Sequence, residues 1–317
     1  MKQLFIILNF VLTISFAFGQ FTAPKEYFDL VKKADSYYAA KDYKNSAKTY
    51  SLAFKSFGWK GFINNRYCAA CSWALAGNLD SAFYMLEKIV FKANYSNFQQ
   101  ISSDKALVTL YDDSRWLKLL DQVTKNKEKA ELGLNKPLLY LLDSLAKEDQ
   151  KWRNYLSKFE NKELKRDPIS KETILENIKY TDDLNYIEMK KIYKKFGFPN
   201  YDLVGPDGSH NFWLLVQHQD AHPKFQDTVL NTMKKEVDKG KASVTDYAYL
   251  VDRVKINSGK LQIYGTQMVL NSTQSSYEPL PVIEPENLNE RRKTVGLGSI
   301  EAYIETMNTN YFEKSKK

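Results

Sequence analysis

Cysteine and histidine are scarce in this chain. Its 317 residues include two cysteines and three histidines. Cys68 and Cys71 lie within RYCAACSWALAG, which reads as the middle of a helix with no strand before it. A redox CxxC belongs at a helix N-terminus after a strand, and a cysteine pair without nearby histidines is a poor zinc site. We therefore interpret both cysteines as small core residues, with a functional disulfide as the alternative.

Long apolar runs are confined to the N-terminus. Residues 1–19 read as a secretory signal peptide, with Lys2 before the apolar stretch LFIILNFVLTISFAF and small residues at Ala17 and Gly19. This pattern predicts cleavage before Gln20, and an uncleaved anchor is the alternative. No later stretch is long and apolar enough to span a membrane. We expect a periplasmic or secreted protein without an integral membrane segment after cleavage.

Familiar catalytic and nucleic-acid signatures are also missing. Ser209 lacks a GxSxG context, and neither a phosphate loop nor a paired-carboxylate motif is present, so no cofactor is expected. The net charge of +8 comes from dispersed basic clusters. We interpret it as favouring solubility, and no nucleic-acid partner is expected. A hydrophobic content of 43% and an aromatic content of 14% support well-packed cores.

Residues 20–130 are predicted to form a helical repeat domain. Small and aromatic residues recur with a period of roughly 34 to 36 residues, a pattern that resembles the tetratricopeptide repeat. Ala34 and Tyr37 stand in the first unit, and Ala70 and Trp73 in the second. Such an array offers a shallow surface for a protein or peptide partner, or serves only as a scaffold for the next domain.

A charged stretch at 124–136 marks the predicted linker, and residues 131–317 form the second predicted domain. An amphipathic helix is expected to follow the linker, with an apolar stripe formed by Leu138, Leu141, Leu142, Leu145, Trp152 and Leu156. Two helical segments should come next, of which Asp182 or Asp183 caps the second. FGFPNYDLVGPDGSHN is expected to be a loop before a helix at FWLLVQH. KLQIYGTQMVL and SSYEPLPVIEP predict an irregular hairpin. The predicted fold is mostly α, a short tetratricopeptide-like array followed by a helical domain with a small β hairpin.

Polar residues at the ends of the apolar stripes of the second domain form the candidate site. The apolar run from Phe212 to Val216 carries Gln217, His218 and Asp220 to the edge of the core. His218, oriented by Asp149, Asp220 or Asp252, is the candidate general base. The candidate clamp for an anionic group consists of Arg153, Arg253, Arg291 and Arg292. Tyr264 and Gln267 could form a wall of the pocket. The candidate ligand-binding residues are Gln217, Arg153, Asp252, Arg253, Tyr264, Gln267, Arg291 and Arg292.

A metal site is not predicted, although His218 and His222 have the i, i+4 spacing of zinc-binding helices. Pro223 disfavours helical geometry at His222, so the two imidazoles should not share a helix face. The polar residues also fit a second interpretation, a packed network that fixes the helices without binding anything. Both interpretations of the cluster stay open at this point.

The order DQxxR, GFP-x4-VG, WLLVQHxD, PxFQ, AYLxDRV, YGTQ and RRxxVGL resembles an uncharacterised bacterial domain, domain-of-unknown-function family six-six-two-four, from about Leu138 to Tyr303. The resemblance implies no activity. His222 and Gln219 depart from the family pattern, which has an acidic and a small residue there. The resemblance implies that the polar motif positions are Asp149, Gln150, Arg153, Gln217, His218, Asp220, Asp252, Arg253, Tyr264, Gln267, Arg291 and Arg292.

We predict an exported binding protein, with a polar ligand pocket in the second domain and a partner surface on the helical repeats. The ligand would be small and polar or anionic. The alternative function is a cofactor-independent hydrolase or transferase that uses His218 as general base. The surroundings of His218 test whether it is catalytic. An exposed imidazole in a cleft, bonded to a carboxylate and facing arginines, favours an enzyme, and a fully enclosed imidazole favours a structural role.

Overall fold

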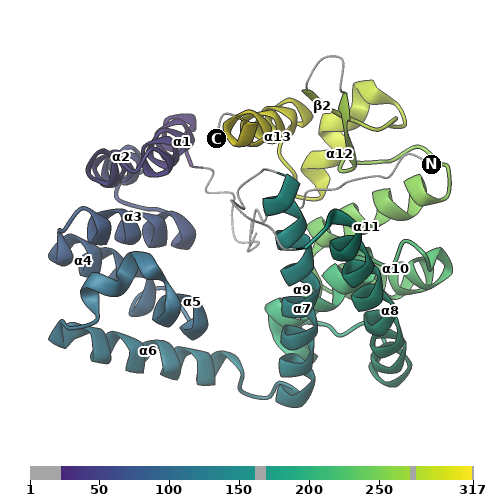
Figure 1. The fold of residues 1–317 in the computed structure, drawn as a ribbon, viewed down its shortest axis with the longest axis horizontal. Helices are drawn as coiled ribbons and strands as arrows, with labels where there is room; N and C mark the ends of the chain where they lie inside the picture. The colour runs from purple at the N-terminus through teal and green to yellow at the C-terminus, as the bar shows by residue number, and fades with distance from the viewer. Residues whose placement is uncertain (1–22, 161–168, 272–275, 316–317) are drawn as a thin grey trace. The chain divides into compact units, whose positions relative to one another are not determined.

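The computed structural model describes residues 23–160, 169–271 and 276–315. The predicted signal peptide, residues 1–19, lies outside the described residues. The described chain is mostly helical with a small two-stranded sheet, which confirms the predicted fold class (Figure 1). Among the described helices, none has the length and apolar content needed to cross a membrane. The described residues divide into two compact units, residues 23–132 and residues from Gly133 onward.

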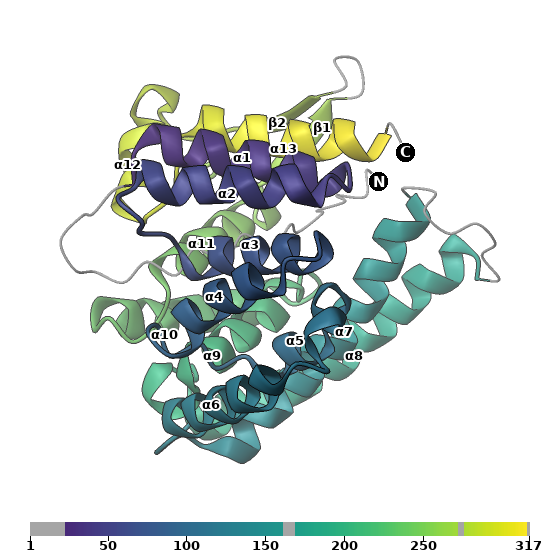
Figure 2. The same cartoon turned by 90° about the vertical axis from the view of Figure 1, so that its left-hand side faces the viewer.

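The N-terminal unit is a stack of helices that pack on one another in chain order (Figures 1 and 2). Alanines and aromatic residues fill its core, as the small-residue and aromatic pattern of the sequence requires. That the stack is a tetratricopeptide array remains a prediction. The elements of this unit are α1 (Lys25–Ala39), α2 (Tyr43–Ser56), α3 (Ile63–Leu75), α4 (Leu79–Val90), α5 (Phe98–Ser103), the 3-10 helix η1 (Lys105–Leu110) and α6 (Ser114–Ala130).

Side-chain caps set where several of these helices begin. Asp42 and Asn78 accept hydrogen bonds from the amides of Asn45 and Ser81, so one free amide at the start of each of α2 and α4 is satisfied. The charged stretch predicted as a linker is helical as far as Ala130, which corrects that part of the prediction. Lysine and glutamate form helices readily, and composition alone does not distinguish an exposed helix end from a linker.

Both cysteines lie in the middle of α3, as predicted, and both are free thiols. Cys71 is buried, but Cys68 is exposed, so the interpretation of both as core residues is wrong for Cys68. This difference follows from helix geometry. Cys68 and Cys71 are three residues apart, so they point in similar but not identical directions around α3, and Cys68 reaches the edge of the buried face.

The C-terminal unit has a core of its own, centred on Phe212, Leu215 and Val229. α9 lies between α7 and the later helices, and it packs on α7, α8, α10 and α11. The elements of this unit are α7 (Lys136–Glu160), α8 (Lys171–Phe196), α9 (Tyr201–Gln217), α10 (Pro223–Asp238), α11 (Val244–Asn257), β1 (Met268–Asn271), β2 (Ser276–Pro279), the 3-10 helix η2 (Pro285–Asn287), α12 (Leu288–Thr294) and α13 (Ile300–Ser315).

The expected loop before FWLLVQH is confirmed only at residues 197–200, and residues 201–211 are the first part of α9. Asn200 caps the helix, and a kink at Gly205, with φ of 70°, is followed by Pro206. Gly208 allows α9 to approach α7 closely, since a Cβ there would meet Leu139 at 2.9 Å. Gly205 and Pro206 therefore form a kink, and Gly208 permits a close helix contact. Local composition does not distinguish these two roles from a loop.

α8 is one helix, which corrects the two predicted segments. Ser170 caps it, and Asp182 and Asp183 lie in its interior. The predicted hairpin is confirmed, with β1 antiparallel to β2 and Met268 opposite Pro279. The first strand is shorter than predicted, because residues 261–267 form an irregular segment.

Candidate functional site

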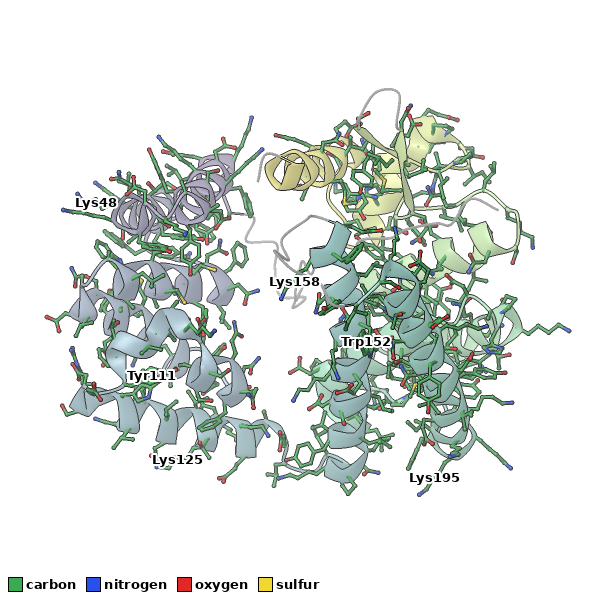
Figure 3. All side chains as sticks on the ribbon, in the orientation of Figure 1. Lys48, Tyr111, Lys125, Trp152, Lys158 and Lys195 are labelled. Atoms are coloured by element: carbon green, nitrogen blue, oxygen red, sulfur yellow. The ribbon has the colours of Figure 1, made fainter. Side chains whose placement is uncertain are left out.

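Three helices bring the first group of polar side chains together. α7, on which Trp152 is labelled in Figure 3, supplies Asp149 and Arg153, and α8 supplies Asp182. α9 ends at Gln217, so His218 is its C-cap residue. The burial of Phe212 to Val216 drives α9 into the core and leaves the polar residues at its end beside the other helices.

A buried histidine–aspartate pair is the centre of this group. The Nδ1 atom of His218 lies 2.9 Å from a carboxylate oxygen of Asp149, and the two side chains are 8% and 1% exposed. A carboxylate accepts hydrogen bonds, so Nδ1 carries the proton and donates it to Asp149. Nε2 is then the acceptor nitrogen of the neutral ring. Within the described chain, no protein group bonds to Nε2.

Arg153 connects this pair to α8. Its Nε atom lies 3.2 Å from Asp149, and its terminal nitrogen bonds to Asp182 at 2.5 Å. Asp182 is a site residue that the sequence interpretation assigned to a helix cap instead. Its helical spacing to the buried Asn185 and Met189 indicates the inward face of α8, and that signal was available in the sequence.

The surroundings shift the pKa values of the two carboxyl groups, Asp149 and Asp182, and of the His218 imidazole. Burial alone would raise the pKa of Asp149, but His218 and Arg153 outweigh it and hold that pKa well below its usual range. Burial and the charge of Arg153 lower the pKa of His218, despite Asp149. Burial raises the pKa of Asp182 to about 6, although Arg153 opposes it. At neutral pH the site therefore holds an ionised Asp149 and a neutral His218.

Because the pKa of His218 is lowered, we predict that its ring becomes protonated only at a pH below 6.5. Between the folded pKa and about 6.5 the unfolded chain binds more protons, so this group makes stability fall as the pH falls. Asp182 acts oppositely, since its raised pKa makes stability fall as the pH rises from about 4 to 6. Nitrogen-detected NMR should give a His218 pKa below 6.5, and titration at or above 6.5 would contradict the prediction. Unfolding curves of His218→Gln and Asp182→Asn, each compared with wild type, separate the two contributions.

Asp220 was considered as a partner of His218, but in the structure its partner is Arg253. It bonds to Arg253 through both carboxylate oxygens, at 2.8 and 2.5 Å, and accepts a further bond from Asn257. Asp220 therefore does not orient His218. Gln226 donates to the carbonyls of Val216 and Gln217 at the end of α9. This second group fixes α10 and α11 beside the helix end.

Asp252 organises a third group. Its carboxylate is fully buried and accepts hydrogen bonds from the amides of Ile263, Tyr264 and Thr266 and from the Thr266 hydroxyl. Asp252 and Arg253 are adjacent on α11, so they point about 100° apart and serve different partners. The side chain that was expected beside His218 thus holds the irregular segment 261–267 in place.

Several predicted wall and clamp residues also belong to this third group. Arg292 donates to the carbonyls of Tyr264 and Gly298, and Arg291 donates to the carbonyl of Ile263. Gln267 donates to the Thr266 hydroxyl. The structure therefore brings Asp149, Arg153 and His218 together, and it places Asp252, Tyr264, Gln267, Arg291 and Arg292 in a separate hydrogen-bond network.

The predicted arginine clamp for an anion is not supported by this geometry. Arg153 and Arg253 are bonded to aspartates, and Arg291 and Arg292 to backbone carbonyls. Each guanidinium group therefore already has a partner, as buried charges in proteins require.

The polar residues offer no evident metal ligands. In the described residues, no group of three or more histidine, cysteine or acidic side chains is arranged to hold a metal ion. His222 stacks on Tyr186 with ring centroids 3.4 Å apart, and it precedes Pro223 at the start of α10. Two buried acceptors are left over, because the Oε1 atoms of Gln217 and Gln267 have no partner within the described chain.

The chain was compared with known proteins. No curated protein and no solved structure matches it. Residues 145–316 match a family of unknown function, DUF6624. The matched segment contains α7 from its third turn and α8 to α13, so it includes every polar group described above. Because the match covers more than half of the chain, this protein belongs to the family of unknown function DUF6624.

Proposed function

We propose that the C-terminal unit binds a small polar ligand at His218 and that the ligand donates a hydrogen bond to Nε2. The observation that carries the proposal is the one-sided anchoring of the ring. Asp149 holds Nδ1 at 2.9 Å, and no protein group in the described chain bonds Nε2. His218 is only partly buried and its Nε2 is not among the fully enclosed atoms, so a ligand hydroxyl or amine could reach this acceptor and donate to it.

The charges near His218 favour a neutral or cationic ligand over an anionic one. Arg153 is already shared between Asp149 and Asp182, and Arg253 is paired with Asp220. These residues bring three carboxyl groups and two guanidinium groups to the helix end. An anion would meet an excess of negative charge there, whereas a hydroxyl or amine would meet acceptors.

Export and partner binding by the N-terminal unit complete the proposed function. Export is supported by the signal-like pattern of residues 1–19. Partner binding is supported by exposed aromatic side chains at Phe28, Trp59 and Phe62, of which Phe28 and Phe62 stack on each other. Exposed aromatic residues are enriched where proteins bind partners.

A ligand screen by saturation-transfer NMR tests the binding site. The probes are neutral hexoses, polyols, amino sugars and short diamines, each added to the full chain without its first 19 residues. We expect hits that weaken at least about tenfold in His218→Ala, because the acceptor is lost. His210→Ala is the matched control, since it also removes an imidazole whose Nδ1 bonds to an aspartate, Asp246, but one outside the His218 group. Equal weakening in both variants, or hits unaffected by His218→Ala, would refute the proposal.

Acid–base catalysis is the second candidate function, as a cofactor-independent hydrolase or transferase. The observation that favours it is the pairing of perturbed groups, a neutral His218 oriented by Asp149 beside a carboxyl group, Asp182, with a pKa of about 6. Neighbouring groups with opposed shifts are typical of an acid and a base in one site. Turnover that is lost in both Asp149→Asn and His218→Gln, with ligand binding retained in Asp149→Asn, would establish catalysis over binding alone.

A further inference from the structure

A groove on the C-terminal unit lies apart from the His218 group. Side chains of α8 and α10 line an open space of about 480 Å³. Its walls include Tyr186, Ile187 and Tyr193 of α8 and Phe225 of α10. Ligand sites commonly have volumes of about 300 to 1,000 Å³ and mainly apolar, aromatic walls with a few polar groups. The groove has the size and lining of a site for a small molecule.

The aromatic wall is held in place before any ligand arrives. Tyr186 stacks on His222 with an interplanar angle of 6°, and Phe225 meets Tyr186 and Tyr193 edge to face. The hydroxyl of Tyr193 donates to the carbonyl of Thr228 across the groove. Side chains that are already ordered lose little entropy on binding, which favours affinity.

Two of the three lysines that line the groove have no acidic partner among the described residues. Lys190 and Lys194 are one turn apart on α8, and in the described part of the chain neither forms a salt bridge. The Lys190 ammonium lies 5.1 Å from the Tyr186 ring, directly over the aromatic wall. By contrast, Lys191 is paired with Glu188. The basic end of α8 is visible in Figure 3, where Lys195 is labelled.

We propose that this groove binds a small amphiphilic anion, with its acyl or aromatic part against Tyr186, Tyr193 and Phe225 and its carboxylate at Lys190 and Lys194. The apolar walls would remove the hydrocarbon from water, and two ammonium groups would neutralise the single charge. A neutral molecule would leave the lysines without a partner, and a cation would be repelled. The groove is separate from the proposed ligand site at His218, so an experiment can refute one proposal without refuting the other.

Calorimetric titration with three eight-carbon probes tests the proposal. The full chain without its first 19 residues is titrated with octanoate, octan-1-ol and octylamine at pH 7.5, below micelle-forming concentrations. We expect saturable binding of about one octanoate per chain, at least about tenfold weaker binding of octan-1-ol and no detectable binding of octylamine. Chemical shifts should change at Tyr186, Tyr193 and Phe225. Equal binding of the alcohol, or binding only to phosphatidylglycerol vesicles, would overturn the proposal.

Two variants and a matched control locate the site. Lys190→Gln/Lys194→Gln should weaken octanoate binding about tenfold or more, because both ammonium groups are removed. Thr228→Phe should block it by filling the groove from an exposed position, while the backbone carbonyl that Tyr193 uses is retained. Lys234→Gln/Lys239→Gln removes the same charge from lysines outside the groove that pair with Asp238 and Glu236. Loss of binding in this control equal to that in Lys190→Gln/Lys194→Gln would overturn the assignment.

Discussion

Replacing Asp252 with alanine is expected to lower the free energy of unfolding of the C-terminal unit by about 3 to 5 kcal/mol. The carboxylate is fully buried and accepts from three backbone amides and a hydroxyl in residues 263–266. Alanine would leave these donors without partners, and each unsatisfied buried group costs about 1 to 3 kcal/mol. The segment leads into β1, so the hairpin should lose its order first.

Hydrogen exchange read by mass spectrometry measures this effect, because it reports on each unit of a two-unit chain separately. Exchange should accelerate in residues 261–271 and in α11 of Asp252→Ala. Asp238→Ala is the matched control, since Asp238 forms an exposed ion pair with Lys234, and such pairs contribute about 0 to 1 kcal/mol. An Asp252→Ala protein as stable as this control would contradict the assigned role.

Replacing Asp149 with alanine is expected to cost about 3 kcal/mol or more in the same unit. His218 would lose its only hydrogen-bond partner in the described chain, and Arg153 would keep only Asp182. The depressed pKa of Asp149 means that its stabilisation is fully present above about pH 4 and is lost as the pH falls through the folded pKa. Wild type and variant should therefore converge in stability under strongly acidic conditions.

Asp149→Asn distinguishes charge from hydrogen bonding in this effect. The amide oxygen can still accept from Nδ1 of His218, but the ion pair with Arg153 is lost, so the cost should be smaller than for alanine. Urea unfolding followed by exchange in α7, α8 and α9, repeated from pH 7 downward, provides the measurement. An Asp149→Ala variant with an unchanged midpoint and an unchanged pH profile would show that the buried pair contributes nothing to folding.

Helix positions were predictable where a local pattern decides them. The apolar stripe of Leu138, Leu142 and Leu145 predicted α7, and the run from Phe212 to Val216 predicted the buried part of α9. Prediction was wrong where one residue type serves two purposes. Gly205 and Pro206 mark a kink within a helix as readily as a loop, and Asp182 resembles a cap although it faces an arginine.

The sequence by itself determined the fold class, the mostly helical order of elements and the presence of polar residues at the end of α9. These follow from periodicity and propensity, which act over a few neighbouring residues. Only the tertiary structure decided which polar groups meet. Asp149 reaches His218 across 69 positions, and Asp220 reaches Arg253 across 33, because the packing of α7, α8, α10 and α11 around α9 sets those distances. Adjacent residues such as Asp252 and Arg253 then serve separate networks, since helical rotation points them in different directions.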